Sequence, residues 1–181
     1  MKEKAIRTTQ PIREIENIAK MKEVLPSVRD RILFTIGINT GLRISDLVKL
    51  KPEDFKDGHI EIREQKTGKV NRLKVSDSVW RQIKEYIDAY PKEWMFTSRK
   101  GGHISTHQAW VIISAAGKKL GLEHIGTHSM RKTFGYHAWK QGKNITLIQD
   151  ALNHSSQRIT MKYLGISEDI KNKDLYGQMG L

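Results

Sequence analysis

Apolar residues recur at helical spacing along most of this 181-residue chain, and strict alternation is confined to one short stretch. Helices are predicted at residues 12–25, 32–40, 44–50, 77–90, 105–120, 129–141, 145–152 and 157–163. Pro26, Gly41 and Pro52 end the first three, and Ser156 is a suitable N-cap for the last. A helical repeat and a strand repeat place side chains on different faces, so this pattern predicts a mainly helical fold.

The alternating stretch predicts the only sheet. Polar and apolar side chains alternate at residues 59–63 and again at 72–75, and a polar turn of sequence KTGK at residues 66–69 lies between them. A glycine-containing turn between two alternating segments indicates a β-hairpin. The predicted fold class is therefore mainly α with a small antiparallel β-sheet inserted early, an α+β arrangement.

The chain is long enough for one domain with a sizeable core. We predict an N-terminal arm at residues 1–11, a single domain at 12–166, and a polar C-terminal tail at 167–181. No uninterrupted apolar run approaches the length of a membrane span. Cysteine is absent, which excludes disulfides and thiolate metal sites and fits a microbial cytoplasm.

Charge is the informative part of the composition. The 32 Lys and Arg residues outnumber the 20 Asp and Glu residues and give a formal net charge of +12. An excess of this size favours a polyanionic partner, above all nucleic acid, because phosphate contacts release condensed counterions. A basic surface that binds nothing in particular is the alternative.

Three short motifs carry residue types suited to phosphate chemistry. In the first, Arg43 follows a glycine turn at the start of a predicted helix, and Asp46 comes one turn later. A cation at a helix N-terminus opposes the helix dipole, and an anion bound by both the guanidinium and the helix end would favour it there. Asp46 would then hold the guanidinium in place. An ordinary surface ion pair is the alternative.

The second motif places His128 and Arg131 three residues apart at the start of another predicted helix, hence on one face. A histidine can move protons near neutral pH, and an arginine can bind two phosphate oxygens at once. The alternative is a polar helix start without a catalytic role.

The third motif combines His154, in a turn between helices, with Tyr163 near the end of the last predicted helix. A tyrosine there is more commonly a core residue with an exposed hydroxyl, and a histidine in a turn commonly has a structural hydrogen bond. Neither residue indicates chemistry when it is considered alone.

Together, the motifs resemble the active-site series of the tyrosine recombinase, or phage integrase, family. The series in this sequence is Arg43, Lys66, His128, Arg131, His154 and Tyr163. The surrounding segments are similar as well: TGLRISDL, KTGK, THSMRKTF and LNHSSQRITMKYLG. The resemblance extends from about residue 32 to about residue 167 and implies the catalytic-domain fold of that family.

The resemblance implies a mechanism as well as a fold. Tyr163 would attack a DNA phosphodiester, forming a 3′-phosphotyrosyl link and releasing a 5′-hydroxyl. Arg43 and Arg131 would bind the nonbridging oxygens, and His154 would donate a further hydrogen bond. Bond energy is conserved in the link, so no cofactor and no metal are expected.

The remaining residues of the series receive supporting roles from the same resemblance. Lys66 would be the general acid that protonates the leaving 5′-oxygen. His128 is the candidate base for the tyrosine hydroxyl, whose ordinary pKa is near 10. Asp46 corresponds to the acidic residue that often follows the first arginine.

The implied partner is double-stranded DNA, bound by a tetramer on paired sites, with a monomer or weak oligomer when free. Accessory DNA-bending proteins and a tail at 167–181 that is exchanged between subunits are further implications, as is a nucleoid-associated location. Members usually carry a core-binding domain before the catalytic one. The sequence therefore represents either a piece of a longer protein or a compact member.

A recombinase that integrates or excises a mobile element is the leading hypothesis. A type IB topoisomerase-like enzyme uses similar tyrosine chemistry, but the small size and the spacing from LNHSS to Tyr163 favour a recombinase. A non-catalytic DNA-binding regulator would not need a nucleophile.

Overall fold

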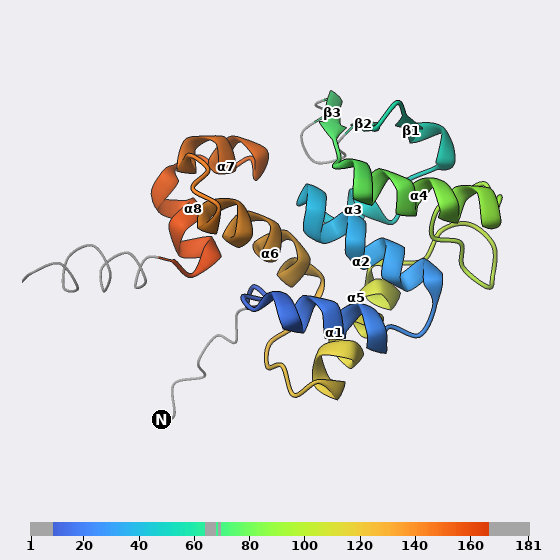
Figure 1. The fold of residues 1–181 in the computed structure, drawn as a ribbon, viewed down its shortest axis with the longest axis horizontal. Helices are drawn as coiled ribbons and strands as arrows, with labels where there is room; N and C mark the ends of the chain where they lie inside the picture. The colour runs from blue at the N-terminus through green and yellow to red at the C-terminus, as the bar shows by residue number, and fades with distance from the viewer. Residues whose placement is uncertain (1–8, 64–67, 69, 167–181) are drawn as a thin grey trace, which may run out of the picture.

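The computed structural model describes residues 9–63, 68 and 70–166 and has one helical body with a small sheet at one side (Figure 1). The helices are α1 (Ile15–Val24), α2 (Val28–Thr40), α3 (Ile44–Leu47), α4 (Asp77–Ala89), α5 (Thr106–Lys119), α6 (Thr127–Lys140), α7 (Ile145–Ala151) and α8 (Gln157–Leu164). A 3-10 turn, η1 (Pro52–Asp54), precedes the strands β1 (Phe55–Lys56), β2 (His59–Arg63) and β3 (Val70–Lys74). No helix among the described residues is long and apolar enough to cross a membrane.

The predicted α+β class is confirmed, and the sheet is antiparallel with the order β1-β2-β3. Ile60 pairs with Phe55 on one side and with Leu73 on the other. The sequence pattern missed β1, because a two-residue strand is too short to alternate. The predicted Ser156 cap is confirmed: its hydroxyl accepts a hydrogen bond from the Ile159 amide at 3.2 Å.

Four predicted helix boundaries were wrong by two residues or more, and the largest difference is at α2, which begins at Val28 and not at residue 32. The first helix begins at Ile15, three residues later than expected, because Ile12 is buried in an extended segment. The helix expected at residues 44–50 ends at Leu47, and the one expected from residue 129 begins at Thr127. Helix ends depend on local hydrogen bonds that apolar periodicity does not report.

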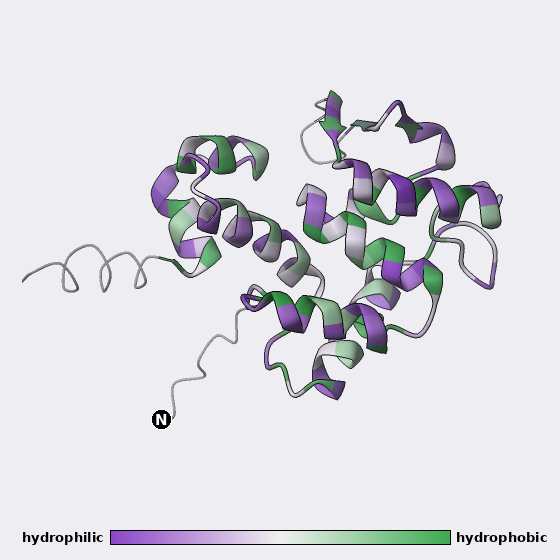
Figure 2. Cartoon of the chain, in the orientation of Figure 1, coloured by the Kyte–Doolittle hydropathy of each residue, from purple (hydrophilic) through white to green (hydrophobic). Residues whose placement is uncertain are grey.

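The central element is α2, which packs against α1, α3, α4 and α6. Its residues Leu33, Phe34 and Ile36 are completely buried. Figure 2 shows the contrast with α4, where polar residues recur along the outer side while α2 is mostly apolar in its middle. A helix that is apolar on several faces must be enclosed by other elements, and here it organises the larger core.

The hydrophobic core is divided into two clusters. The larger one is built mainly from α1 to α5 and the sheet, and it includes Met130 at the start of α6. The smaller one contains Tyr136, Ile148, Leu152, Leu164 and Ile166. Helix α6 therefore contributes to both clusters, and α7 and α8 pack around its second half (Figure 1).

A short extended segment, residues 9–13, runs beside α6 and is called the strap below. The Ile12 amide donates a hydrogen bond to the Thr133 hydroxyl at 2.9 Å. The Arg13 guanidinium donates to the Gly165 carbonyl, also at 2.9 Å, just after the end of α8. The strap thus connects the middle of α6 with the C-terminal end of α8.

Close contact between α6 and α8 depends on Gly135. A β-carbon at this position would lie 2.6 Å from Leu164 Cδ2 and 3.2 Å from Leu152 Cδ1. Both leucines are completely buried, so neither can move aside freely. The absence of a side chain at residue 135 allows α8 to approach α6.

We expect Gly135→Ala to lower the free energy of unfolding by roughly 1–3 kcal/mol, the usual cost of overpacking a tight site. Urea denaturation followed by circular dichroism measures this change. Lys140→Ala, at an exposed position of the same helix, is the control and should change stability by less than about 0.5 kcal/mol. Equal stability of Gly135→Ala and the wild type would show that α8 does not pack this closely.

Candidate active site

The residues selected from the sequence lie where several elements end. Arg43 is the N-cap of α3, and Arg131 lies in the second turn of α6. His154 lies in the loop between α7 and α8, and Tyr163 is the penultimate residue of α8. These positions face one another across the junction between the two core clusters, as the following contacts show.

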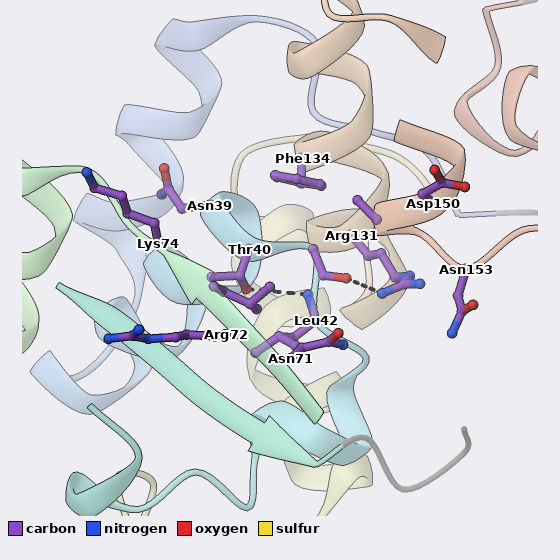
Figure 3. Close-up of a pocket in the computed structure, with 13 residues that line it drawn as sticks. Asn39, Thr40, Leu42, Asn71, Arg72, Lys74, Arg131, Phe134, Asp150 and Asn153 are labelled. Carbon is purple, nitrogen blue, oxygen red and sulfur yellow. Dashed lines mark hydrogen bonds between the residues drawn. The ribbon is translucent and has the colours of Figure 1, made fainter. Parts of the chain in front are cut away.

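Arg131 is the most deeply placed member of the site, with 7% of its surface exposed. One guanidinium nitrogen donates a short hydrogen bond to the Gly41 carbonyl, at the C-terminal end of α2 (Figure 3). The other terminal nitrogen donates to the Leu152 carbonyl at 2.6 Å, at the end of α7. The positive charge of Arg131 also acts on the Tyr163 side chain. Its guanidinium is therefore held in one orientation by the ends of two helices, α2 and α7.

Tyr163 lies against His154, with ring centroids 4.8 Å apart and the two rings close to perpendicular. Burial raises the pKa of Tyr163 above its usual value, while the charges of Arg131 and Arg43 and the hydrogen bond from Arg131 act in the opposite direction. The tyrosine is consequently protonated at neutral pH and needs a proton acceptor to become a nucleophile.

The hydrogen bonds of Thr160 fix the tautomer of His154. The Thr160 hydroxyl donates its proton to the Ser156 carbonyl at 3.2 Å. Its oxygen therefore accepts the hydrogen bond from His154 Nδ1, at 3.1 Å. Neutral His154 then carries its proton on Nδ1 and has a lone pair on Nε2. Thr160 is completely buried, so this arrangement is well shielded from water.

Burial lowers the pKa of His154, and the positive charges of Arg131 and Arg43 lower it further. Arg43 thus acts electrostatically on both His154 and Tyr163, which places it within reach of the same small region. Asp46 is buried in α3, three residues after Arg43. The four residues Arg43, Arg131, His154 and Tyr163 are brought together.

The other two residues of the predicted series are His128, which lies less centrally, and Lys66. His128 is exposed at the start of α6, and partial desolvation together with the charges of Lys132 and Arg131 lowers its pKa. It is therefore neutral and able to accept a proton at neutral pH. Lys66 lies outside the described residues, so its role stays a prediction.

Sequence reasoning missed two residues of this region, Lys132 and Thr160. Lys132 Nζ lies 4.9 Å from the centre of the Tyr163 ring. The only signal in the sequence was its position directly after Arg131 in a basic segment. Thr160 lies six residues after His154, on the other side of the start of α8. Their contact could have been anticipated only after the start of the helix at Ser156 was known.

A cavity of about 290 Å³ opens beside the Arg131 guanidinium. Figure 3 shows Asn71, Arg72 and Lys74 of β3 on one side of it and Arg131, Asp150 and Asn153 on the other. Basic and amide side chains on these walls suit an anionic or polar occupant. Among the described residues, no group of three or more His, Asp and Glu side chains is arranged to hold a metal ion.

Comparison with known proteins identifies the family of the chain. The model of the phage integrase family matches residues 10–169. The chain is 44% identical to the probable integrase/recombinase YoeC of Bacillus subtilis (strain 168) over 165 residues, covering 88% of this chain and 91% of that protein. It is 31% identical to tyrosine recombinase XerA of Pyrococcus furiosus over 161 residues, covering 84% of this chain and 56% of XerA.

The fold agrees too. A crystal structure of the XerH site-specific recombinase bound to palindromic difH substrate, a post-cleavage complex, superposes with a TM-score of 0.75 at 20% identity. The match covers 94% of this chain and 53% of XerH, so the chain spans about half the length of XerA and XerH. The chain belongs to the phage integrase family, and its fold is that of a tyrosine recombinase catalytic domain.

The lowered pKa of His154 has a consequence for stability. Unfolding returns the ring to water, where its pKa is about 6.5, so the unfolded chain binds a proton more readily than the folded one. The contribution of His154 to the free energy of unfolding is fully present above the unfolded-state pKa. It is lost as the pH falls from that pKa to the lower pKa of the folded state. We expect His154→Gln to flatten the decline in unfolding free energy between about pH 7.5 and pH 5.5.

Urea titrations at a series of pH values measure this slope. His107→Gln, at an exposed position on α5, is the control for loss of a histidine. An unchanged slope in His154→Gln would mean that the ring titrates equally in both states.

Proposed function

We propose that this chain is the catalytic domain of a site-specific DNA recombinase that cuts and rejoins DNA through a 3′-phosphotyrosyl intermediate, with Tyr163 as the nucleophile. The observation that carries the proposal is the contact between the Tyr163 and His154 rings, 4.8 Å apart, at a place where the charges of buried Arg131 and of Arg43 act on both side chains. A nucleophilic oxygen and donors for a phosphate therefore lie in one place. Membership of the phage integrase family supports the same chemistry.

The reaction balances without an outside reactant. The Tyr163 oxygen forms a bond to phosphorus, and the bond from phosphorus to the 5′-oxygen breaks. The tyrosine proton goes to a base, for which neutral His128 is the candidate, and Lys66 protonates the leaving oxygen. Attack by another 5′-hydroxyl reverses these steps and reseals the strand.

Arg43 and Arg131 stabilise the negative charge on the nonbridging oxygens in the transition state. Arg131 is already held by the Gly41 and Leu152 carbonyls, so little reorganisation is needed when the phosphate enters. The charge of a bound phosphate raises the proton affinity of His154, whose Nε2 then becomes a donor to the same oxygens. Asp46 supports Arg43 from within α3.

The DNA partner is inferred from charge and from relatives. The net charge of +12 suits a polyanion, and the XerH structure contains its difH substrate. Integration or excision of a mobile element is the biological outcome that we propose, because the Bacillus relative is named a probable integrase/recombinase. Such exchange needs a tetramer on two DNA sites, weak association when DNA is absent, and accessory DNA-bending proteins.

Three further expectations complete the proposal. Residues 12–166 act as the catalytic domain, after an arm at 1–11. Residues 167–181 are exchanged between subunits in the tetramer. The protein works in a microbial cytoplasm, in contact with the nucleoid.

We expect Tyr163→Phe to abolish covalent attachment to DNA, because phenylalanine has no oxygen to bond to phosphorus. A nicked suicide substrate carrying the cognate site traps the adduct, which a denaturing gel then detects. Phenylalanine preserves the ring contact with His154, so folding should be kept. An adduct of equal yield in Tyr163→Phe would assign the nucleophile to another residue. Relaxation of supercoiled DNA lacking any cognate site would favour a topoisomerase-like activity instead.

We expect Arg43→Ala to slow single-turnover cleavage by about 100- to 1,000-fold, the usual effect of removing one donor from transition-state charge. DNA affinity should change far less, because one phosphate contact among many is lost. Cleavage rates at saturating DNA and a fluorescence-anisotropy titration separate the two quantities.

The control is Arg81→Ala, which removes an exposed arginine on α4 and should keep the wild-type rate. Losses of equal size in binding and cleavage for Arg43→Ala would indicate a purely electrostatic attraction for DNA.

A further inference from the structure

Lys132 is an unusual lysine because only 9% of its surface is exposed. Its ammonium donates a hydrogen bond to the Thr9 carbonyl in the strap, at 2.7 Å. The strap is itself fixed by the bonds from Ile12 to Thr133 and from Arg13 to Gly165. A side chain that is normally flexible is thus held in one position by a segment more than 120 residues away in the sequence.

The same ammonium lies over the face of the Tyr163 ring, 4.9 Å from its centre. A cation in this position is attracted to the electron-rich face of an aromatic ring, and burial strengthens the attraction because less water screens it. Removal of the phenolic proton adds negative charge to the ring system. The attraction therefore grows as Tyr163 becomes a nucleophile.

We propose that Lys132 is a positioning residue for the nucleophile: fixed by the strap, its ammonium holds the Tyr163 ring and stabilises the phenolate that forms during attack. This inference rests on the proposed role of Tyr163. An interaction that is stronger in the transition state than in the ground state increases the rate of the chemical step and leaves substrate binding almost unchanged.

The burial of Lys132 distinguishes this role from a direct contact with DNA. A phosphate-binding lysine needs an exposed ammonium, whereas this one already donates to Thr9 and faces an aromatic ring. Burial also lowers the pKa of Lys132, as expected for a group placed by packing rather than by solvent.

Three substitutions separate charge from structure. Lys132→Met removes the charge and the hydrogen bond, Lys132→Gln removes the charge but keeps a donor for the Thr9 carbonyl, and Lys132→Arg keeps both. We expect Met and Gln to slow single-turnover cleavage of the suicide substrate about 3- to 30-fold at saturating DNA, with unchanged DNA affinity. Arg should stay within about threefold of the wild type. The rise of rate with pH should shift to higher pH in Met and Gln.

Lys140→Met is the matched control, since it removes an exposed lysine from the same helix and should keep the wild-type rate. Circular dichroism identifies any variant that does not fold. If Lys132→Met fails to fold, the comparison of Lys132→Gln with Lys132→Arg still tests the inference. Wild-type rates in Lys132→Gln would overturn the inference, as would a loss confined to DNA affinity. If neither the wild type nor Tyr163→Phe formed an adduct, the proposed function itself would fail. That result differs from a failure of the Lys132 inference alone, in which the wild type still forms the adduct.

Discussion

The hydrogen bonds of Arg131 connect the two halves of the molecule. Its guanidinium donates to Gly41, at the end of α2 in the larger core, and to Leu152, at the end of α7 in the smaller core. Both carbonyls terminate helices and have no intrahelical donor, so the arginine supplies a bond that each helix end needs. A buried charge is costly unless it is hydrogen bonded in this way. The connection between the two halves therefore depends on one side chain, the same one that is proposed to bind the phosphate.

A consequence of this arrangement is a concentration of positive charge in a partly dry region. Burial lowers the pKa of both His154 and His128; the charges of Arg131 and Arg43 add to this effect at His154, and those of Lys132 and Arg131 add to it at His128. Like charges raise the free energy of the empty site, and an entering phosphate reduces it. The histidines are therefore neutral and the tyrosine protonated at neutral pH. In the proposed reaction, the negative charge of a bound phosphate would oppose the effect of the two arginines on His154 and would favour its protonation at that step.

The sequence allowed the fold class to be predicted because apolar periodicity reports which face of a helix is buried. It also provided the residues Arg43, Arg131, His154 and Tyr163, although each was ambiguous when considered alone. Their convergence depends on how α6, α7 and α8 pack, which a one-dimensional pattern does not contain. Lys132 was overlooked because its partner Thr9 is more than 120 residues away. Thr160 was overlooked because a threonine on a helix has no chemical signature until its neighbour is known.

The position of Tyr163 in the smaller core has a further physical meaning. Five buried residues form the centre of this core, and partly buried residues including Tyr163 pack against them; a cluster of that size gives little stability alone. Helix α8 is held instead by Gly135 contact with α6, by Arg13 at Gly165 and by the Lys132 ammonium over the tyrosine ring. Elements fixed by a few polar contacts open at lower free energy than elements enclosed by a large core. Tyr163, the proposed nucleophile, therefore lies in the smaller half of the molecule, while Arg131 is hydrogen bonded to both halves. Because Lys132 contacts both Thr9 of the strap and the Tyr163 ring, a displacement of the strap would be expected to reach the tyrosine through this one side chain.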